Sequence, residues 1–401
     1  MKLPLRLRAG VLATVVIVST VLLLIALAVL SLWEADYLLF SRTHFIQTQR
    51  AHIRSTFTLY RHNPQIIDRL DADSTLPLYD SVPGSRMRLS RTPWGLYEVL
   101  SVSSMNGEVH QSCLFGAETP WKEDCNFYYC NHDGSVTATG KTNLKGKVRI
   151  PQNGIVYGQM RSVFFHGERI TPQNISRSEA TLPPVSARIG AIMDFMPVDM
   201  VELTDSIYQP FYRSDPLYVN AGTGMLVNCH ISGQVALYGG ELHFDRSCRL
   251  DDVLVIADNI TIGEGFRGSA QLFARDTVWI EKNVTLEIPS GIYAGSYAEI
   301  ADGTEVNGYA IVDSGGEKQP KKPNYRQSRL ATLRGLLYVD GIAQLQGMVS
   351  GAVFLDEAAY YASEGYYRNM IFDATVLTNR ETACPFWLET GVKRKEAKWV
   401  R

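Results

Sequence analysis

Aliphatic and polar residues alternate in the stretch VLVIADNITIGEGF, which starts at Val253, and related patterns start at Leu272 and Ile292. When the three stretches are laid one beneath another, identical residues fall into two columns: Ala257, Ala274 and Ala294, then Ile262, Ile280 and Ile300. The repeat is about 17 to 20 residues long, and its differences in length fall in turns. Such a repeat is typical of a coil in which each turn stacks on its neighbours. The pattern therefore predicts a parallel β-helix, or β-solenoid, over residues 216–376.

A second pattern lies near the N-terminus, where residues 9–33 include no ionisable side chain. At about 1.5 Å per residue, a helix of this length covers the roughly 30 Å hydrocarbon core of a bilayer. Charges of opposite sign flank the run: Lys2, Arg6 and Arg8 before it, and Glu34 and Asp36 after it. The positive-inside rule then predicts a single-pass protein of the inner (cytoplasmic) membrane, with a cytoplasmic tail at residues 1–8 and the bulk of the chain extracytoplasmic. A cleavable signal peptide is the alternative, although its apolar region is normally about 7 to 15 residues long.

Residues 34–63 continue the helical period beyond the predicted transmembrane helix. Pairs of apolar or aromatic residues recur at a fixed interval: Leu38-Leu39, Phe45-Ile46, His52-Ile53 and Leu59-Tyr60. This interval places the pairs on one stripe of a helix, and Pro64 disfavours helix at the residue before it. We therefore expect a juxtamembrane amphipathic helix, whose stripe contacts either the protein's own body or another chain.

The remaining segments differ in their pattern of apolar, polar and turn-forming residues. Residues 64–174 alternate branched and aromatic residues with polar ones between turn residues, which predicts a β-rich region that is a candidate for early solenoid coils. Residues 175–215 break this pattern, notably at Pro183-Pro184, and are expected to form a connector with short helices. Residues 377–401 are expected to form a basic tail.

The composition limits the classes of partner that the protein can bind through its overall charge. The 401 residues are 45% hydrophobic and 20% charged, which is typical of an ordered protein, and the net charge of −2 gives no field that would attract nucleic acid. One basic segment interrupts the predicted coils: Lys318, Lys321, Lys322, Arg326 and Arg329. It is a candidate contact for an acidic surface, such as lipid headgroups or an anionic envelope polymer. A flexible surface loop is the alternative.

The chain has six cysteines, and an extracytoplasmic location favours disulfides. Cys229 and Cys248 are about one repeat apart, so a disulfide between them would link adjacent coils. Cys125 and Cys130 are expected to close a short hairpin-like loop. A zinc site is the alternative for this pair with the neighbouring residues Cys113 and His132, but the spacing matches no familiar Cys-x2-Cys pair. We therefore expect no metal and no cofactor.

Two enzyme classes use stacked β-coils, and neither fits well. Hexapeptide acyltransferases need three hexapeptides per coil and a histidine base, whereas this chain shows one per coil and has no histidine after His243. Polysaccharide lyases and hydrolases need clustered carboxylates. The densest charged stretch is DRSCRLDD, with Asp245, Arg246, Arg249, Asp251 and Asp252, and no second acidic cluster follows one repeat later. We therefore expect no catalytic residues.

Two resemblances follow from these patterns. A membrane helix that continues into an amphipathic helix ahead of a β-rich body resembles pilins and pseudopilins over about residues 1–63, with Gly10 at the boundary between basic and apolar segments. Val15 stands where that family carries an acidic residue. The stretch LLYVDGIAQLQGMVSGAVF, in which Gly341, Gly347 and Gly351 separate short strands, resembles bactofilin-like polymer-forming β-solenoids over residues 217–376. The second resemblance implies self-association through stacked strands.

The sequence thus predicts a mainly β protein with one N-terminal transmembrane helix, an amphipathic extension, a β-rich region and a β-solenoid. Its expected function is that of a non-enzymatic, membrane-anchored structural or scaffold component of a cell-envelope or pilus-like assembly. Its expected partners are the membrane and either further copies of itself or another envelope component. The alternative is a β-helix protein that binds or cleaves an envelope polysaccharide.

Overall fold

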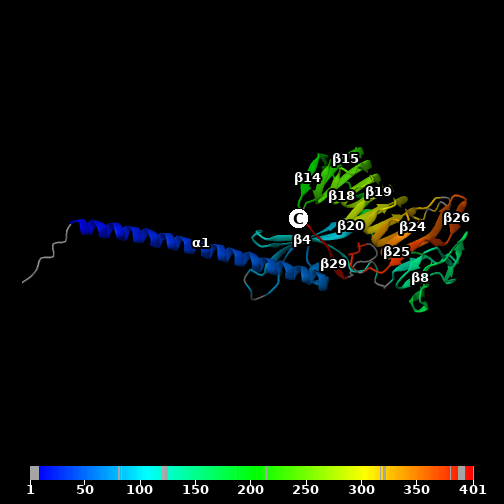
Figure 1. The fold of residues 1–401 in the computed structure, drawn as a ribbon, viewed down its shortest axis with the longest axis horizontal. Helices are drawn as coiled ribbons and strands as arrows, with labels where there is room; N and C mark the ends of the chain where they lie inside the picture. The colour runs from blue at the N-terminus through cyan, green and yellow to red at the C-terminus, as the bar shows by residue number, and fades with distance from the viewer. Residues whose placement is uncertain are drawn as a thin grey trace, which may run out of the picture.

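The protein is mainly β, with one long N-terminal helix that projects from a β-rich body (Figure 1). The computed structural model describes residues 9–79, 82, 84–119, 121, 125–185, 187–212, 215–316, 318, 322–379, 381–386 and 393–400. An antiparallel sheet and a larger parallel sheet make up the body. Three short helical segments complete it: α2 (Pro64–Asp68), η1 (Pro172–Asn174) and α3 (Arg188–Asp194).

Helix α1 (Ala9–His62) runs without a break for 54 residues, about 80 Å at the usual rise. It is long and apolar enough to cross a membrane. All side chains described from residue 11 to residue 45 are exposed. The helix ends at His62, as the following Pro64 predicts, because proline disfavours helical backbone at Asn63.

The last turns of α1 pack against the protein's own body. Ile53, Phe57 and Tyr60 are buried in a cluster with residues of the antiparallel sheet, and the Tyr60 ring meets the Phe115 ring edge-on with centroids 5.0 Å apart. Leu38, from the first predicted pair, stays 60% exposed. The predicted stripe is therefore an internal packing surface in its C-terminal half and a free surface in its N-terminal half.

The antiparallel sheet has the order β1-β2-β3-β4-β29. Its strands are β1 (Asp73–Pro77), β2 (Arg86–Trp94), β3 (Tyr97–Ser104), β4 (His110–Ala117) and β29 (Arg394–Val400). Four of the five strands follow α1 directly in sequence. The fifth is the last strand of the chain, so the two ends of the sequence meet in one sheet.

The prediction of a basic tail is therefore wrong for residues 394–400. Arg394 is only 7% exposed, because its guanidinium lies 3.5 Å from a Glu98 oxygen and donates to the Tyr60 hydroxyl at 3.2 Å. Tyr60 in turn donates to Glu98 at 2.7 Å. Lys398 forms an ion pair with Asp252 at 2.7 Å. Arg394 and Lys398 are thus bound to the chain's own carboxylates, and they join strand β29 to α1 and to both sheets.

The parallel strands follow a closed path around a common interior. The main strands are β15 (Leu217–Leu226), β16 (His230–Gly233), β17 (Val235–Phe244), β18 (Arg249–Ile262), β19 (Arg267–Ile280), β20 (Thr285–Ala294), β21 (Tyr297–Ile300), β22 (Glu305–Asp313), β23 (Tyr325–Gln327), β24 (Thr332–Gln344), β25 (Gly347–Ala362) and β28 (Ala374–Leu377). The register confirms both predicted columns: Ala257 pairs with Ala274 and Ala274 with Ala294, while Ile262 pairs with Ile280 and Ile280 with Ile300.

Both ends of the parallel stack are formed by segments for which the sequence pattern predicted another position in the fold. At one end lie β13 (Val201–Glu202) and β14 (Ser206–Gln209), which belong to the predicted connector. Beyond β25 and β28, at the other end, lie β5 (Phe127–Tyr129), β7 (Asn143–Leu144), β8 (Val148–Ile150) and β12 (Ile175–Arg177). The β-rich region thus supplies the last members of the stack, not its early coils. Figure 1 shows β14 and β8 at opposite ends of the body.

Smaller pairings complete the body near this second end. A three-stranded sheet contains β6 (Val136–Thr139), β9 (Ile155–Tyr157) and β27 (Met370–Phe372). Two hairpins are formed by β10 (Gln159–Met160) with β11 (Val163–Phe164), and by β25 with β26 (Gly365–Arg368).

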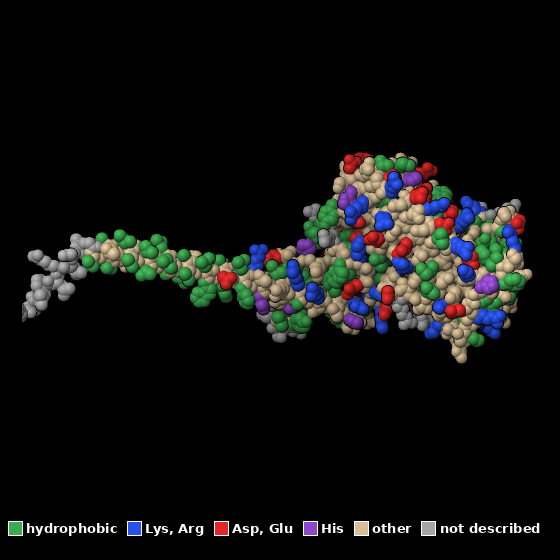
Figure 2. All heavy atoms as spheres, in the orientation of Figure 1, with side chains coloured by type: hydrophobic (Ala, Val, Ile, Leu, Met, Phe, Trp, Pro, Cys, Tyr) green, Lys and Arg blue, Asp and Glu red, His purple; other side chains and the backbone are tan. Residues whose placement is uncertain are grey.

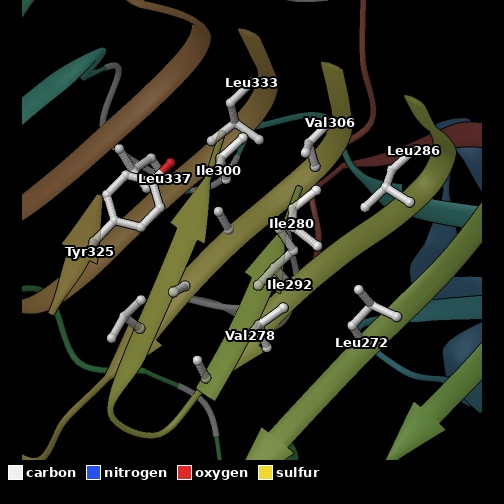
Figure 3. Close-up of a cluster of buried hydrophobic side chains, with 14 of the residues drawn as sticks. Leu272, Val278, Ile280, Leu286, Ile292, Ile300, Val306, Tyr325, Leu333 and Leu337 are labelled. Carbon is white, nitrogen blue, oxygen red and sulfur yellow. The ribbon is translucent and has the colours of Figure 1, made fainter. Parts of the chain in front are cut away.

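Successive residues of the parallel strands face opposite sides. Leu272 points into the closed interior, where side chains from neighbouring strands pack together (Figure 3), whereas Phe273 lies in a second cluster with the antiparallel sheet. Runs such as GLLYV and GAVFL are apolar throughout because both faces of these strands are covered. The core therefore has three main layers: one inside the parallel sheet, one between the two sheets, and one between the antiparallel sheet and α1.

One buried glutamine makes three hydrogen bonds where the antiparallel sheet meets the parallel sheet. Gln271 is buried in β19, where its Oε1 accepts from the Leu96 N–H at 2.9 Å and from the Tyr309 hydroxyl at 3.0 Å. Its Nε2 donates to the Trp94 carbonyl at 3.0 Å. The turn between β2 and β3 includes Gly95 at φ +59, where a β-carbon would overlap the Gln271 amide. The close approach therefore requires glycine at the turn and an amide beneath it.

Candidate functional site: the open end of the parallel sheet

The stack ends in two short strands with free outer edges. β13 pairs only with β15, and β14 only with β16, among the described strands. In β14 the Gln209 carbonyl accepts from the backbone N–H of Gln234 at 2.7 Å, on the side of the stack. Because neighbouring residues of a strand direct their backbone groups to opposite sides, the N–H and C=O of Tyr208 face outward. This edge can therefore accept another strand.

Large apolar side chains are exposed around this edge: Met196, Val198, Val201, Tyr208 and Met225. Val198 is 97% exposed and Tyr208 58%. The charged residues of 194–209 are all acidic: Asp194, Asp199, Glu202 and Asp205. Figure 2 shows hydrophobic and acidic side chains together at the upper end of the body, where Figure 1 places β14 and β15. An exposed apolar patch of this kind marks an interaction surface.

The opposite end of the stack, at β12, also has exposed apolar side chains and a free strand edge. β12 pairs only with β8 among the described strands, and its side chains are half-buried or exposed. Apolar side chains are exposed here too, with Val163 at 38% and Phe164 at 58%. Basic residues outnumber acidic ones in residues 155–178, where Arg161, Arg169 and Arg177 stand against Glu168. The two ends thus share exposed apolar side chains, and residues 194–209 and 155–178 differ in the sign of their charged residues.

The predicted disulfide partners Cys229 and Cys248 lie side by side near the β14 end. Each precedes a strand, and the paired residues His230 and Arg249 that follow them are in register. Cys229 and Cys248 are not joined by a disulfide in this structure. A hydrogen bond between the Cys229 and Cys248 thiols lowers the pKa of Cys248 to about 7 and raises that of Cys229. A Cys248 thiolate is the nucleophile that disulfide formation requires.

We expect Cys229 and Cys248 to be linked when the full chain is purified without reductant. The closed loop is about 20 residues long, so the disulfide should stabilise the fold by about 3 kcal/mol. Alkylation followed by peptide mass mapping should recover the linked peptides, and Cys248→Ser should remove the stabilisation. Cys113, which is buried in β4, is the internal control and should remain a free thiol. Recovery of alkylated Cys229 and Cys248 from the oxidised protein would contradict the prediction.

Cys125 and Cys130 do not close a hairpin-like loop, because the extended strand β5 lies between them. Cys125 donates to the Phe127 carbonyl at 3.3 Å, whereas Cys130 lies beside Asp356. A disulfide needs the two Cα atoms within about 7 Å, which an intervening strand opposes. Cys113, the third member of the alternative zinc set, belongs to a different core cluster from these two cysteines.

The basic segment 318–329 is bound to the protein's own surface. Lys321 lies outside the described residues. The other four members meet partners within the chain: Lys318 meets Asp356 and Glu357, Arg326 meets Glu299, Arg329 meets Asp373, and Lys322 lies over the Tyr297 ring. An anionic polymer at this surface would have to compete with these carboxylates. Contact with an acidic surface stays a prediction.

Carboxylates from successive turns gather in a groove of about 440 Å³. Asp245 lines it together with Glu264 and Glu281, so the structure supplies the acidic neighbours that the sequence pattern had not shown. The Glu281 carboxylate accepts from the Glu264 backbone N–H at 2.9 Å, which ties these groups to the turns. No aromatic ring except His243 lines the groove among the described residues. A polysaccharide-binding face would combine clustered carboxylates with aromatic rings. Among the described residues that line the groove, the carboxylates are present and such rings are not.

Comparisons of the chain with protein-family models, curated proteins and solved structures found no match.

Sequence reasoning missed the β14 end as a surface. The available signal was short: VELT, from Val201 to Thr204, alternates apolar and polar residues, and the strand formers Ile207 and Tyr208 follow. The preceding Pro183-Pro184 and the short helical segment favoured a connector instead.

Proposed function

We propose that this protein is a membrane-anchored, non-enzymatic structural component of the cell envelope that associates with further copies of itself. α1 would anchor it in the inner membrane with the N-terminus inside, and the parallel sheet would be a β-solenoid displayed outside. The observation that carries this proposal is the free edge of β13 and β14, with its exposed apolar side chains.

The second copy would bind head to tail. Parallel stacking gives the two ends of the sheet different surfaces, so the contact joins the β14 edge of one copy to the β12 edge of the next. The acidic residues of 194–209 would then face the basic residues of 155–178, and apolar side chains would be covered on both sides. A heterologous contact of this kind does not close by two-fold symmetry and generates a chain of subunits. A pilus-like or sheet-like envelope assembly would follow from such chains.

We expect the full-length protein in detergent micelles to form oligomers whose mass increases with concentration, measured by sedimentation velocity. Tyr208→Pro removes the outward N–H of β14 and should reduce assembly by about tenfold or more, because proline cannot donate to an added strand. The matched control Tyr208→Thr keeps this N–H and a residue suited to strands, so it should assemble more than Tyr208→Pro.

Mixing distinguishes a head-to-tail contact from other modes of assembly. Tyr208→Pro retains an intact β12 edge, so small amounts added to the native protein should terminate chains and reduce their mean length. A strict monomer at all concentrations, or assembly unaffected by Tyr208→Pro, would exclude this interface. In the second case α1 would be the remaining element for self-association.

A further inference from the structure

We propose that Cys130, His132 and Asp356 form a zinc site that joins the residues after β5 to strand β25. This inference does not depend on self-association. It changes the expectation that the chain has no metal site. Of the alternative zinc set considered from the sequence, it keeps Cys130 and His132, and it adds Asp356, a carboxylate far away in the chain.

The sheet brings the three residues together. β5 pairs in parallel with β25, with Tyr129 opposite Leu355, so the next residues on the two strands are Cys130 and Asp356. The Cys130 N–H donates to the Leu355 carbonyl at 3.0 Å, which fixes the thiol at this position. His132 follows two residues later and turns back toward the same carboxylate. Backbone pairing therefore positions two of the three ligands.

The ligating atoms already form a compact group. Cys130 Sγ, His132 Nε2 and an Asp356 carboxylate oxygen all lie within 4.8 Å of one another. The His132 Nε2 lies 2.6 Å from Asp356 Oδ1. Zinc bonds of about 2.0 to 2.3 Å place tetrahedral ligands roughly 3.3 to 3.7 Å apart, so the histidine and the carboxylate need to separate by only about 1 Å.

The donor set suits zinc better than other common ions. Zinc accepts thiolate, imidazole and carboxylate together, whereas magnesium and calcium prefer oxygen ligands alone. Cys130 is fully buried, which protects its sulfur from oxidation, while the His132 side chain is 34% exposed. The fourth position would therefore open toward solvent, where a water molecule can complete the tetrahedron.

Lys318 holds the Asp356 carboxylate in place from the side away from His132. Lys318 binds the other carboxylate oxygen, Asp356 Oδ2, at 2.5 Å, and so orients Oδ1 toward His132. Lys318 also contacts Glu357 at 2.9 Å, and Glu357 in turn meets Arg368 at 3.2 Å. The Cys130 thiolate and the Asp356 carboxylate would then neutralise Zn²⁺. Holding a ligating carboxylate through its second oxygen is the usual role of an outer-shell partner.

The test uses the full-length protein in detergent with a non-thiol reductant, freed of metal by a chelator and then dialysed. Titration with zinc against a chromophoric chelator should give one site per chain. Cobalt substitution should give the absorption of a tetrahedral ion and a thiolate-to-cobalt charge-transfer band. His132→Ala should weaken zinc binding by about 100-fold or more, and Cys130→Ser should abolish the charge-transfer band.

The matched control is Cys125→Ser, which removes a buried thiol just before β5, at the opposite end of that strand from Cys130, and should leave both signals unchanged. His132→Ala changes a partly exposed side chain, so its folding is expected to survive and can be checked by circular dichroism. A stoichiometry well below one, or zinc affinity that is the same in the native protein and in His132→Ala, overturns the site. A cobalt spectrum without a thiolate band overturns Cys130 as a ligand.

Discussion

Gly335→Ala should be among the most destabilising single substitutions in this protein, because it acts on a column of glycines where successive parallel strands touch. Gly308 pairs with Gly335 and Gly335 with Gly351 in the parallel register. Gly335 has φ +139, and a β-carbon there would overlap the Gly308 carbonyl oxygen. The obstruction is backbone, so it cannot be relieved by rotating a side chain.

We expect this substitution to lower the free energy of unfolding by about 2 to 6 kcal/mol. Backbone strain at this φ contributes about 1 to 3 kcal/mol, and forcing the coils apart contributes about as much again. Urea unfolding of the full chain in detergent, followed by tryptophan fluorescence, measures the change.

Gly365→Ala is the matched control for the glycine column. Gly365 has a similar φ of +147, but a β-carbon there would meet no atom within 4 Å. It should therefore show the strain alone, and the difference between the two variants measures the close stacking of the coils. Equal effects in both variants would mean that the coils are not held at this distance.

Gln271→Leu should have the second large effect, because it removes three hydrogen bonds to buried groups. These are the Leu96 N–H, the Trp94 carbonyl and the Tyr309 hydroxyl. Each unsatisfied buried group costs about 1 to 3 kcal/mol, so we expect a loss of about 3 kcal/mol or more. Trp94 lies at the affected turn, so its fluorescence should report loosening of the antiparallel sheet.

Gln234→Leu is the matched control for this prediction. Gln234 is as deeply buried beside the same parallel sheet, but its Oε1 has no hydrogen-bond partner among the described residues. Replacing it should change the free energy of unfolding by less than about 1 kcal/mol or increase it. Similar losses in both variants would contradict the role assigned to Gln271 and would indicate a general cost of replacing buried glutamine.

The two predicted columns of alanine and isoleucine show that periodicity can predict which residues of neighbouring strands lie in register. Ala257, Ala274 and Ala294 lie in register as predicted, because each parallel strand pairs only with its neighbours and the repeat follows that pairing. The long apolar run and Pro64 likewise set the course of α1, because helix length and termination depend on nearby residues.

The candidate sites were only partly visible in the sequence. The spacing of Cys229 and Cys248 matched one repeat, so their proximity could be predicted. Asp356 could not be assigned to Cys130, because they are more than half the chain apart and meet only through the pairing of β5 with β25. The free edge at β14 was equally hidden, since a strand pattern does not state which strands remain unpaired.

The sequence by itself determined the apolar helix, the β character of the body and the repeat that stacks successive strands. The tertiary structure alone decided that Arg394 and the last strand return to α1, that residues 125–177 complete the far end of the stack, and that Gln271 joins the two sheets. The physical reason is the range of the interactions. Periodicity reports which face of a segment is buried, whereas the partner of that face is chosen by shape, charge and hydrogen bonding across the whole folded chain.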